Sequence, residues 1–190
     1  MNRAAWIGIA AMVVAMTSGC GLGEVAGTPV PAANQFNTPD TKDKPATRPR
    51  ELRLDGKDPC ATVPKTEWAK YAITGAEPQE NEVFKSPSCF YNSSKASMDV
   101  TLVVTEGIEA WAPGKRLAQP VNVEPVRGFP AISLKLPKQT TECGVAVDVA
   151  QGQYLLASVV IDINDEASLP EGCTYARQFA ETAMNTLVGS

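Results

Sequence analysis

The sequence predicts a single α+β domain, in which an antiparallel β-sheet packs against an N-terminal and a C-terminal helix and two disulfides stabilise the fold. Three observations lead to this prediction. Several segments between residues 83 and 163 alternate apolar and polar residues, as half-buried strands do. Two segments with helical character flank them, and four cysteines lie near the ends of these segments. Strands joined by hairpins and flanked by helices are typical of an antiparallel α+β architecture.

Length and charge limit both the architecture and the partners. Residues 58–190 are enough for one hydrophobic core and too few for two domains. The formal net charge is −4. Nucleic acids and anionic membrane surfaces attract basic proteins, so we expect neither as a partner. We expect the protein to be a monomer.

The chain opens with the three-part pattern of a secretory signal peptide over residues 1–19. Arg3 and the α-amino group form a positive head, residues 4–16 are uncharged and mostly apolar, and small residues follow. The apolar part has about 13 residues, fewer than the roughly 20 that a helix needs to span a bilayer. We therefore expect cleavage and no permanent membrane span.

Cys20 directly follows these small residues, which is the arrangement of a bacterial lipobox. In that signal the cysteine sulfur accepts a diacylglyceryl group and the chain is cut just before it. An ordinary cleaved signal with an incidental cysteine is the alternative. Lipidation also explains the odd total of five cysteines, because it leaves the even set Cys60, Cys89, Cys143 and Cys173. The sequence therefore predicts a cell-membrane protein, anchored through Cys20 with its domain on the extracytoplasmic face.

Residues 20–57 are expected to form a lipid-anchored, disordered, proline-rich tether. Five prolines are scattered through it, with few large apolar side chains between them. Such a composition cannot bury enough surface to offset the entropy of ordering. A flexible chain of this length reaches on the order of 35 Å. The globular domain is then expected to cover residues 58–190.

A short helix over residues 64–72 should open the domain. Proline suits the first turn of a helix, and Glu67 interacts favourably with the positive helix end. Gly75 and Pro78 are expected to end this segment. The strands that follow are predicted over residues 83–91, 98–105, 121–126, 131–136, 143–149 and 154–163. Gln151 and Gly152 should close a tight hairpin between the last two strands.

Cys173 begins the last predicted element, an amphipathic helix. Its apolar residues recur at helical spacing: Ala176, Phe179, Ala180, Ala183 and Leu187. Polar residues lie between them on the other side. A helix of this kind covers one face of a sheet.

The four remaining cysteines allow three pairings. We expect Cys60 to pair with Cys89 and Cys143 with Cys173, because each pair joins a helix start to a strand nearby in sequence. Each bridge would close a loop of about 30 residues and contribute roughly 3 kcal/mol in the entropic account. A four-cysteine zinc site is the alternative, but the close-spaced Cys-x-x-Cys pairs typical of such sites are absent.

Several short motifs occur in a characteristic order and spacing. They are Asp58-Pro59-Cys60 before a helix carrying Glu67, Cys89-Phe90-Tyr91, residues 126–131, residues 143–147, and Cys173-x-x-Ala176-x-x-x-Ala180. Together with the lipobox, they resemble an actinobacterial lipoprotein family known only as a domain of unknown function (DUF3558). The resemblance covers residues 58–187 and implies no established activity. A more distant similarity to extracellular sensor domains of receptor kinases and to PsbP-like envelope lipoproteins implies a curved sheet with a cleft.

The absence of histidine excludes the commonest catalytic arrangements. It removes Ser-His-Asp and Cys-His nucleophiles and the commonest transition-metal ligand. No nucleophile elbow, phosphate-binding loop or dinucleotide fingerprint occurs. The acidic stretch 162–166 lacks the Gly and Glu of a calcium loop, so it is expected to be a solvated loop. We expect no catalytic residue, no metal and no cofactor.

Trp111, Lys115 and Arg116 are the candidate partner contacts. They lie in a loop or short helix expected over residues 106–118. A large aromatic residue beside two cations can meet an envelope polymer or a protein. The alternative is that Trp111 folds back onto the sheet edge.

The sequence thus predicts a lipid-anchored envelope protein that binds a ligand or partner without catalysis, as a sensor or accessory domain. An envelope hydrolase that uses only carboxylates is the alternative. It would need a pocket with two facing acidic side chains and a raised pKa. A third possibility is a purely structural spacer, and the absence of any concave surface would argue for it.

Overall fold

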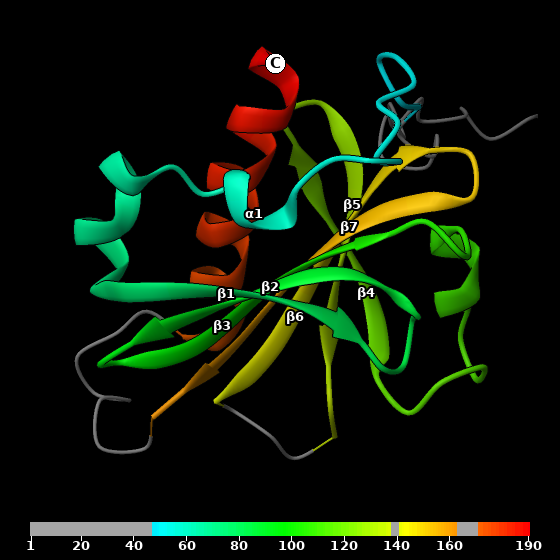
Figure 1. The fold of residues 1–190 in the computed structure, drawn as a ribbon. Helices are drawn as coiled ribbons and strands as arrows, with labels where there is room; N and C mark the ends of the chain where they lie inside the picture. Colours follow the sequence, from blue (N-terminus) through cyan, green and yellow to red (C-terminus); the bar gives the residue numbers. More distant parts are fainter. Residues whose placement is uncertain (1–46, 138–140, 163–170) are drawn as a thin grey trace, which may run out of the picture. The chain divides into compact units, whose positions relative to one another are not determined.

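Seven antiparallel strands form one sheet in the order β1-β2-β3-β7-β6-β5-β4 (Figure 1). Their bounds are β1 Ile73–Asn81, β2 Ser86–Ser93, β3 Ala96–Val103, β4 Gln119–Val126, β5 Phe129–Lys135, β6 Glu142–Ala150 and β7 Gln153–Ile161. The sheet consists of two meanders, β1 to β3 and β4 to β7, which join where β3 pairs with β7. This is a computed structural model, and it describes residues 47–137, 141–162 and 171–190.

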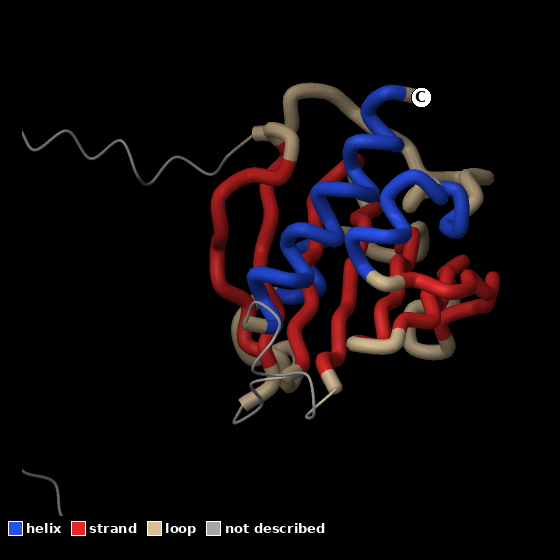
Figure 2. Tube along the Cα trace, turned by 90° about the vertical axis from the view of Figure 1, so that its left-hand side faces the viewer, coloured by secondary structure: helices blue, strands red, loops and turns tan. Residues whose placement is uncertain are grey.

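The helix α1, Gly172–Gly189, packs across one face of the sheet, mainly against β6 and β7 (Figure 2). Its buried side includes all five residues of the predicted apolar stripe: Ala176, Phe179, Ala180, Ala183 and Leu187. They meet the inward-facing residues of β3, β6 and β7 in the main hydrophobic core. The predicted C-terminal helix is confirmed.

The predicted N-terminal helix is not confirmed as an α-helix. Two 3-10 segments stand in its place, η1 Pro59–Ala61 and η2 Lys65–Tyr71. Pro64 precedes η2 and offers no side-chain hydrogen bond to its first turn, and Ala72 ends it in a left-handed conformation. Short segments without such support favour the tighter 3-10 form.

One aromatic side chain at the end of η2 connects it to the core. Tyr71 is fully buried and makes edge contacts with Tyr175 and Phe179 of α1. Its hydroxyl donates to the carbonyl of Gln178 at 2.8 Å and lies 2.6 Å from Thr182 Oγ1. A single ring therefore fastens this segment to α1.

The strand β1 was not predicted from the sequence. Gly75 and Pro78 were expected to end a helix, but both lie inside this strand. Proline is tolerated there because β1 is an edge strand, whose outer row of N–H groups has no strand to pair with. Gly75 lies at a register shift in the pairing with β2. The strand predicted over residues 83–91 consequently begins three residues later, at Ser86.

The other five predicted strands are present, with ends displaced by a few residues. The hairpin between β6 and β7 turns at Gln151 and Gly152, as predicted, and Gly152 has a φ of 72°. A left-handed conformation favours glycine because it has no Cβ to clash. The last predicted strand ends at Ile161, and residues 163–166 of the acidic stretch lie outside the described residues.

The folded unit begins earlier than the sequence suggested. Leu52 and Leu54 are 8% and 0% exposed and belong to the main core. The backbone N–H of Leu52 donates to the carbonyl of Val149 at 2.8 Å. The sequence predicts residues 47–57 as part of the tether because their composition is polar on average. In the structure, however, the two leucines anchor this segment in the hydrophobic core. Cys20 and the rest of the tether lie outside the described residues.

Candidate functional site

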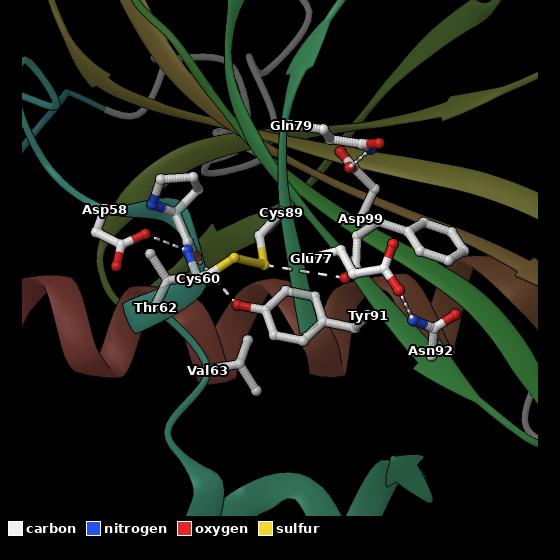
Figure 3. Close-up of a disulfide and its surroundings, with 12 residues drawn as sticks. Asp58, Cys60, Thr62, Val63, Glu77, Gln79, Cys89, Tyr91, Asn92 and Asp99 are labelled. Carbon is white, nitrogen blue, oxygen red and sulfur yellow. Dashed lines mark hydrogen bonds between the residues drawn. A yellow bond between two sulfur atoms is a disulfide. The ribbon is translucent and has the colours of Figure 1, made fainter. Parts of the chain in front are cut away.

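The four domain cysteines form two disulfides, as predicted. Cys60 pairs with Cys89 and connects η1 to β2, with their Cα atoms 5.0 Å apart (Figure 3). Cys143 pairs with Cys173 and connects β6 to the start of α1, at 4.9 Å. The sulfurs bond to one another, so the zinc alternative is excluded. These cysteines hold the two helical segments against the sheet.

The sheet face opposite α1 has an apolar half. Its core consists of Phe84, Val103, Leu134, Ala146, Tyr154 and Leu156. The loop between β3 and β4 covers these residues, and its 3-10 segment η3, Ile108–Trp111, packs against them. This loop carries the three predicted partner contacts.

Two of the three predicted contacts are held inside this covered half. The guanidinium of Arg116 lies 4.5 Å from the ring centre of Trp111 and 5.2 Å from that of Phe84. Its Nη2 also donates to both carboxylate oxygens of Glu106, at 2.7 and 2.6 Å. The structure therefore supports the interpretation in which Trp111 folds back onto the sheet. Lys115 is exposed, whereas Trp111 and Arg116 are partly exposed, and the contact of all three with a partner stays a prediction.

A buried hydroxyl anchors the same loop. Tyr154 donates its O–H to Oε1 of Glu106 at 2.7 Å. Burial and the adjacent Glu106 carboxylate raise the pKa of Tyr154, so it stays a neutral donor. Trp111 Nε1 and Arg116 Nη1 are buried and find no acceptor among the described residues. Glu106, Trp111, Arg116 and Tyr154 thus form a cluster, here called the clasp, that fastens the loop to the sheet. Two of its N–H donors have no acceptor among the described residues.

The other half of this face is polar and open. A row of directly opposed residues crosses it from strand to strand: Glu77 of β1, Phe90 of β2, Asp99 of β3 and Ser158 of β7. Directly opposed residues in antiparallel strands point to the same face and their side chains touch. Glu77 is exposed, and the other three are partly exposed. The row therefore places an aromatic ring between two carboxylates.

Each of these carboxylates is held by a neutral amide. Gln79 Nε2 donates to Oδ2 of Asp99 at 3.1 Å, and Asn92 Nδ2 donates to Oε1 of Glu77 at 2.9 Å (Figure 3). Phe90 belongs to neither hydrophobic cluster of the described residues. We call the group Glu77, Gln79, Phe90, Asn92 and Asp99 the Phe90 platform.

Asp99 is the electrostatically unusual member of the platform. Burial raises its pKa, although hydrogen bonds from Thr101 and Gln79, and the nearby Ser88 hydroxyl, oppose that effect. Thr101 Oγ1 donates to Oδ1 at 2.6 Å. Ser88 is fully buried beside this carboxylate, yet its Oγ has no hydrogen bond of good geometry among the described residues. Each oxygen of the Asp99 carboxylate therefore accepts one hydrogen bond, and the nearby Ser88 hydroxyl is the group left without a partner in the described part of the chain.

Sequence reasoning identified parts of the platform but not the whole. The predicted strand over residues 98–105 contains Asp99, and the motif Cys89-Phe90-Tyr91 contains Phe90. Sequence reasoning missed Glu77 and Gln79 because β1 has almost no apolar alternation, being an edge strand exposed along most of its length. No local signal in residues 73–81 indicates a strand with certainty.

Two polar grooves lie elsewhere on the surface of the described residues. One, of about 320 Å³, lies between η2 and α1 and is lined by Pro64, Glu67, Lys70, Glu181 and Asn185 among others. The other, of about 490 Å³, lies around Arg48 and Asp148. No three His, Cys, Asp or Glu side chains in the ranges 47–137, 141–162 and 171–190 converge as metal ligands. Among the helices the structure describes, none has the length and apolar character of a membrane span.

The sheet, the single packed helix and the two bridges define a disulfide-stabilised α+β domain. The family described as Protein of unknown function (DUF3558) has a sequence model that matches residues 15–186, and the chain belongs to this family. The resemblance seen in the sequence is thus confirmed at the level of the family. Comparison with curated proteins and with solved structures gives no significant match.

Proposed function

We infer that this protein is a lipid-anchored, extracytoplasmic binding domain that presents the Phe90 platform to a ligand or partner and does not catalyse a reaction. The observation that carries this proposal is the platform itself. A partly exposed aromatic ring lies between two carboxylate–amide pairs, on the half of the sheet that no core cluster claims. Binding sites combine apolar contact area with a few convergent polar groups in this way.

The disulfides support the lipid anchor indirectly. Four of the five cysteines are consumed in the two bridges, so Cys20 has no partner within the chain. A cysteine after a short apolar signal is then best explained as the lipid acceptor. Cys20→Ser should release the protein from membranes and abolish palmitate labelling. Membrane retention of an unlabelled variant would refute the anchor.

Both sheet edges support a monomer. The edge strands are β1 and β4. Pro78 lies in β1, and Pro120 and Pro125 lie in β4. Proline removes N–H donors from an edge and so discourages pairing with the edge of another chain.

A carboxylate-only hydrolase is the alternative, and one observation favours it. Asp99 has a raised pKa, and Glu77 lies two strands away in the same row, about 10 Å by strand spacing. An inverting glycosidase separates its carboxyls by roughly that amount. Phe90 lies between the two, however, and Asn92 holds Glu77. Both features suit ligand contact better than attack by water.

The binding proposal is tested by crosslinking the lipidated protein in its envelope and recovering what is attached. Phe90→Ala should lose the attached species. Asn122→Ala is the matched control, since Asn122 is exposed on β4, at the other edge of the sheet. Trp111→Ala should still recover the attached species. Its loss in this variant would place the contact on the loop instead of the platform. Equal recovery from Phe90→Ala and the control would reject the platform as the binding site.

A further inference from the structure

We propose that the group recognised by the Phe90 platform is an organic cation, an ammonium carried by a small molecule or by an envelope component. This inference rests on the proposed function, because it names the ligand chemistry of the same site. It follows from three features of the platform: which polar atoms it leaves unused, the sign of its charge, and the ring between its carboxylates.

The unused polar atoms of the platform are acceptors. The amide nitrogen of Asn92 is directed at Glu77, and that of Gln79 at Asp99. The oxygen of each amide is therefore directed away from the carboxylate that its nitrogen contacts. Glu77 also keeps Oε2 without a hydrogen bond among the described residues. A ligand that fits this surface must donate hydrogen bonds.

The charge of the platform is negative and uncompensated. Neither Glu77 nor Asp99 takes part in a salt bridge within the described part of the chain. By contrast, Asp148 and Glu106, two partly buried carboxylates elsewhere in the described residues, each pair with an arginine. Two carboxylates on either side of one position attract a positive group, and the attraction grows where water is partly excluded.

The ring supplies the third contact. The face of an aromatic ring carries negative partial charge and attracts ammonium groups. Phe90 is directly opposed to Glu77 on one side and to Asp99 on the other. An ammonium over this ring therefore lies between the two carboxylates and feels the attraction of both, and its attached methylenes can cover the ring edge.

Ser88 lies beside Asp99 and can turn its hydroxyl toward that carboxylate. Its side chain is 0% exposed, and its Oγ lacks a partner among the residues described while facing the Asp99 carboxylate. A hydroxyl rotates freely and donates to an ionised carboxylate. The buried hydroxyl thus supports the charged form of Asp99 that a bound cation needs.

The test uses the full-length lipidated protein in detergent, with spermidine as the cationic probe and cellobiose as an uncharged, hydroxyl-rich comparator. Titration calorimetry at low and high sodium chloride measures both. Spermidine should bind, and its affinity should fall several-fold at high salt, because screening weakens charge attraction. Glu77→Gln should weaken spermidine binding about tenfold, as should Phe90→Leu.

Glu124→Gln is the charge-matched control. Glu124 is exposed on β4 and its side chain lies in no salt bridge among the described residues, so this variant removes one negative charge from another part of the surface. It should leave spermidine affinity unchanged. An equal loss in Glu77→Gln and Glu124→Gln would show non-specific attraction to an acidic protein and would overturn the inference.

The failure of this inference is distinguishable from failure of the binding function. If cellobiose binds in a Phe90-dependent manner and spermidine does not, the platform is a ligand site but its ligand is not a cation. If neither probe binds, the cation proposal is overturned. Crosslinking in the envelope then decides separately whether the platform has another occupant.

Discussion

Asp99 lies in the proposed binding surface, and its burial lowers the stability of the folded state when the carboxyl is charged. Burial disfavours its charged form, and its hydrogen bonds with Thr101 and Gln79 do not fully offset this. Functional sites often contain such a compromise between stability and activity.

The raised pKa of Asp99 predicts a specific pH dependence. The folded state holds the Asp99 proton more tightly than the unfolded chain does, so protonation favours folding. This contribution is present at pH below the unfolded pKa and is lost as pH rises through the folded pKa. Asp99→Asn should therefore raise the melting temperature at neutral pH by about 2–4 °C. The gain over the wild type should shrink on acidification.

Thermal melts between mildly acidic and neutral pH check this prediction. Glu77→Gln serves as the control, since Glu77 is exposed and should show no comparable gain. A lower melting temperature for Asp99→Asn at neutral pH would mean that the hydrogen bonds outweigh the burial cost.

Arg116 and Lys115 are neighbours with opposite expected roles. Arg116 stacks on Trp111 and pairs with Glu106, whereas Lys115 is exposed. Arg116→Met should lower the free energy of unfolding by about 2 kcal/mol, because it leaves a half-buried carboxylate unpaired. Lys115→Ala should change it by less than about 0.5 kcal/mol. Urea denaturation of both variants measures the difference, and equal values would contradict the clasp.

At the scale of elements, each disulfide connects a helical segment to a strand. The bridge between Cys143 and Cys173 holds the start of α1 on β6. Replacing both cysteines by Ala should lower the free energy of unfolding by about 3 kcal/mol, the effect of freeing a loop of this length in the unfolded chain. Guanidinium denaturation of the variant and of the wild type would measure this loss of unfolding free energy. An unchanged midpoint would mean that packing of α1 alone fixes this helix.

Edge strands are harder to predict than central ones. The central strands β3, β6 and β7 bury one or both faces, so their apolar residues alternate or run continuously. β1 has a single buried residue, Ile73, and mostly exposed polar ones. Its existence is decided by pairing with β2, and pairing leaves little trace in the strand's own composition.

At the scale of the whole molecule, residues 47–57 belong to the fold. Leu52 and Leu54 enter the core, and Arg48 Nη1 donates to both oxygens of Asp148, at 2.7 and 2.9 Å. Burial raises the pKa of Asp148 despite this arginine. Residues 47–57 are therefore held on the domain by both apolar and charged contacts.

This arrangement predicts where the chain can be cut. The free energy of unfolding of a fragment of residues 47–190 should be at least about 3 kcal/mol higher than that of a fragment of residues 58–190. The reason is that burying each of the two leucines contributes roughly 1.5–3 kcal/mol. Urea denaturation of the two fragments compares them. Similar urea midpoints for the two fragments would mean that residues 47–57 do not contribute to the stability of the domain.

By itself, the sequence determined the fold class, the two cysteine pairs, the C-terminal helix and the strands with clear alternation. Local periodicity carries that information, because it records burial on one side of an element. The proposed anchor at Cys20 also rests on sequence, through the short apolar segment and the cysteine that no bridge uses.

Only the tertiary structure decided the edge strand β1, the start of the domain and the Phe90 platform. Glu77, Phe90 and Asp99 come from three strands and meet through cross-strand register. A register depends on which strands pair and on how each hairpin turns, and no short stretch of sequence contains both. The sequence of any one of these three strands therefore does not predict the candidate site, because the site depends on how the strands pair.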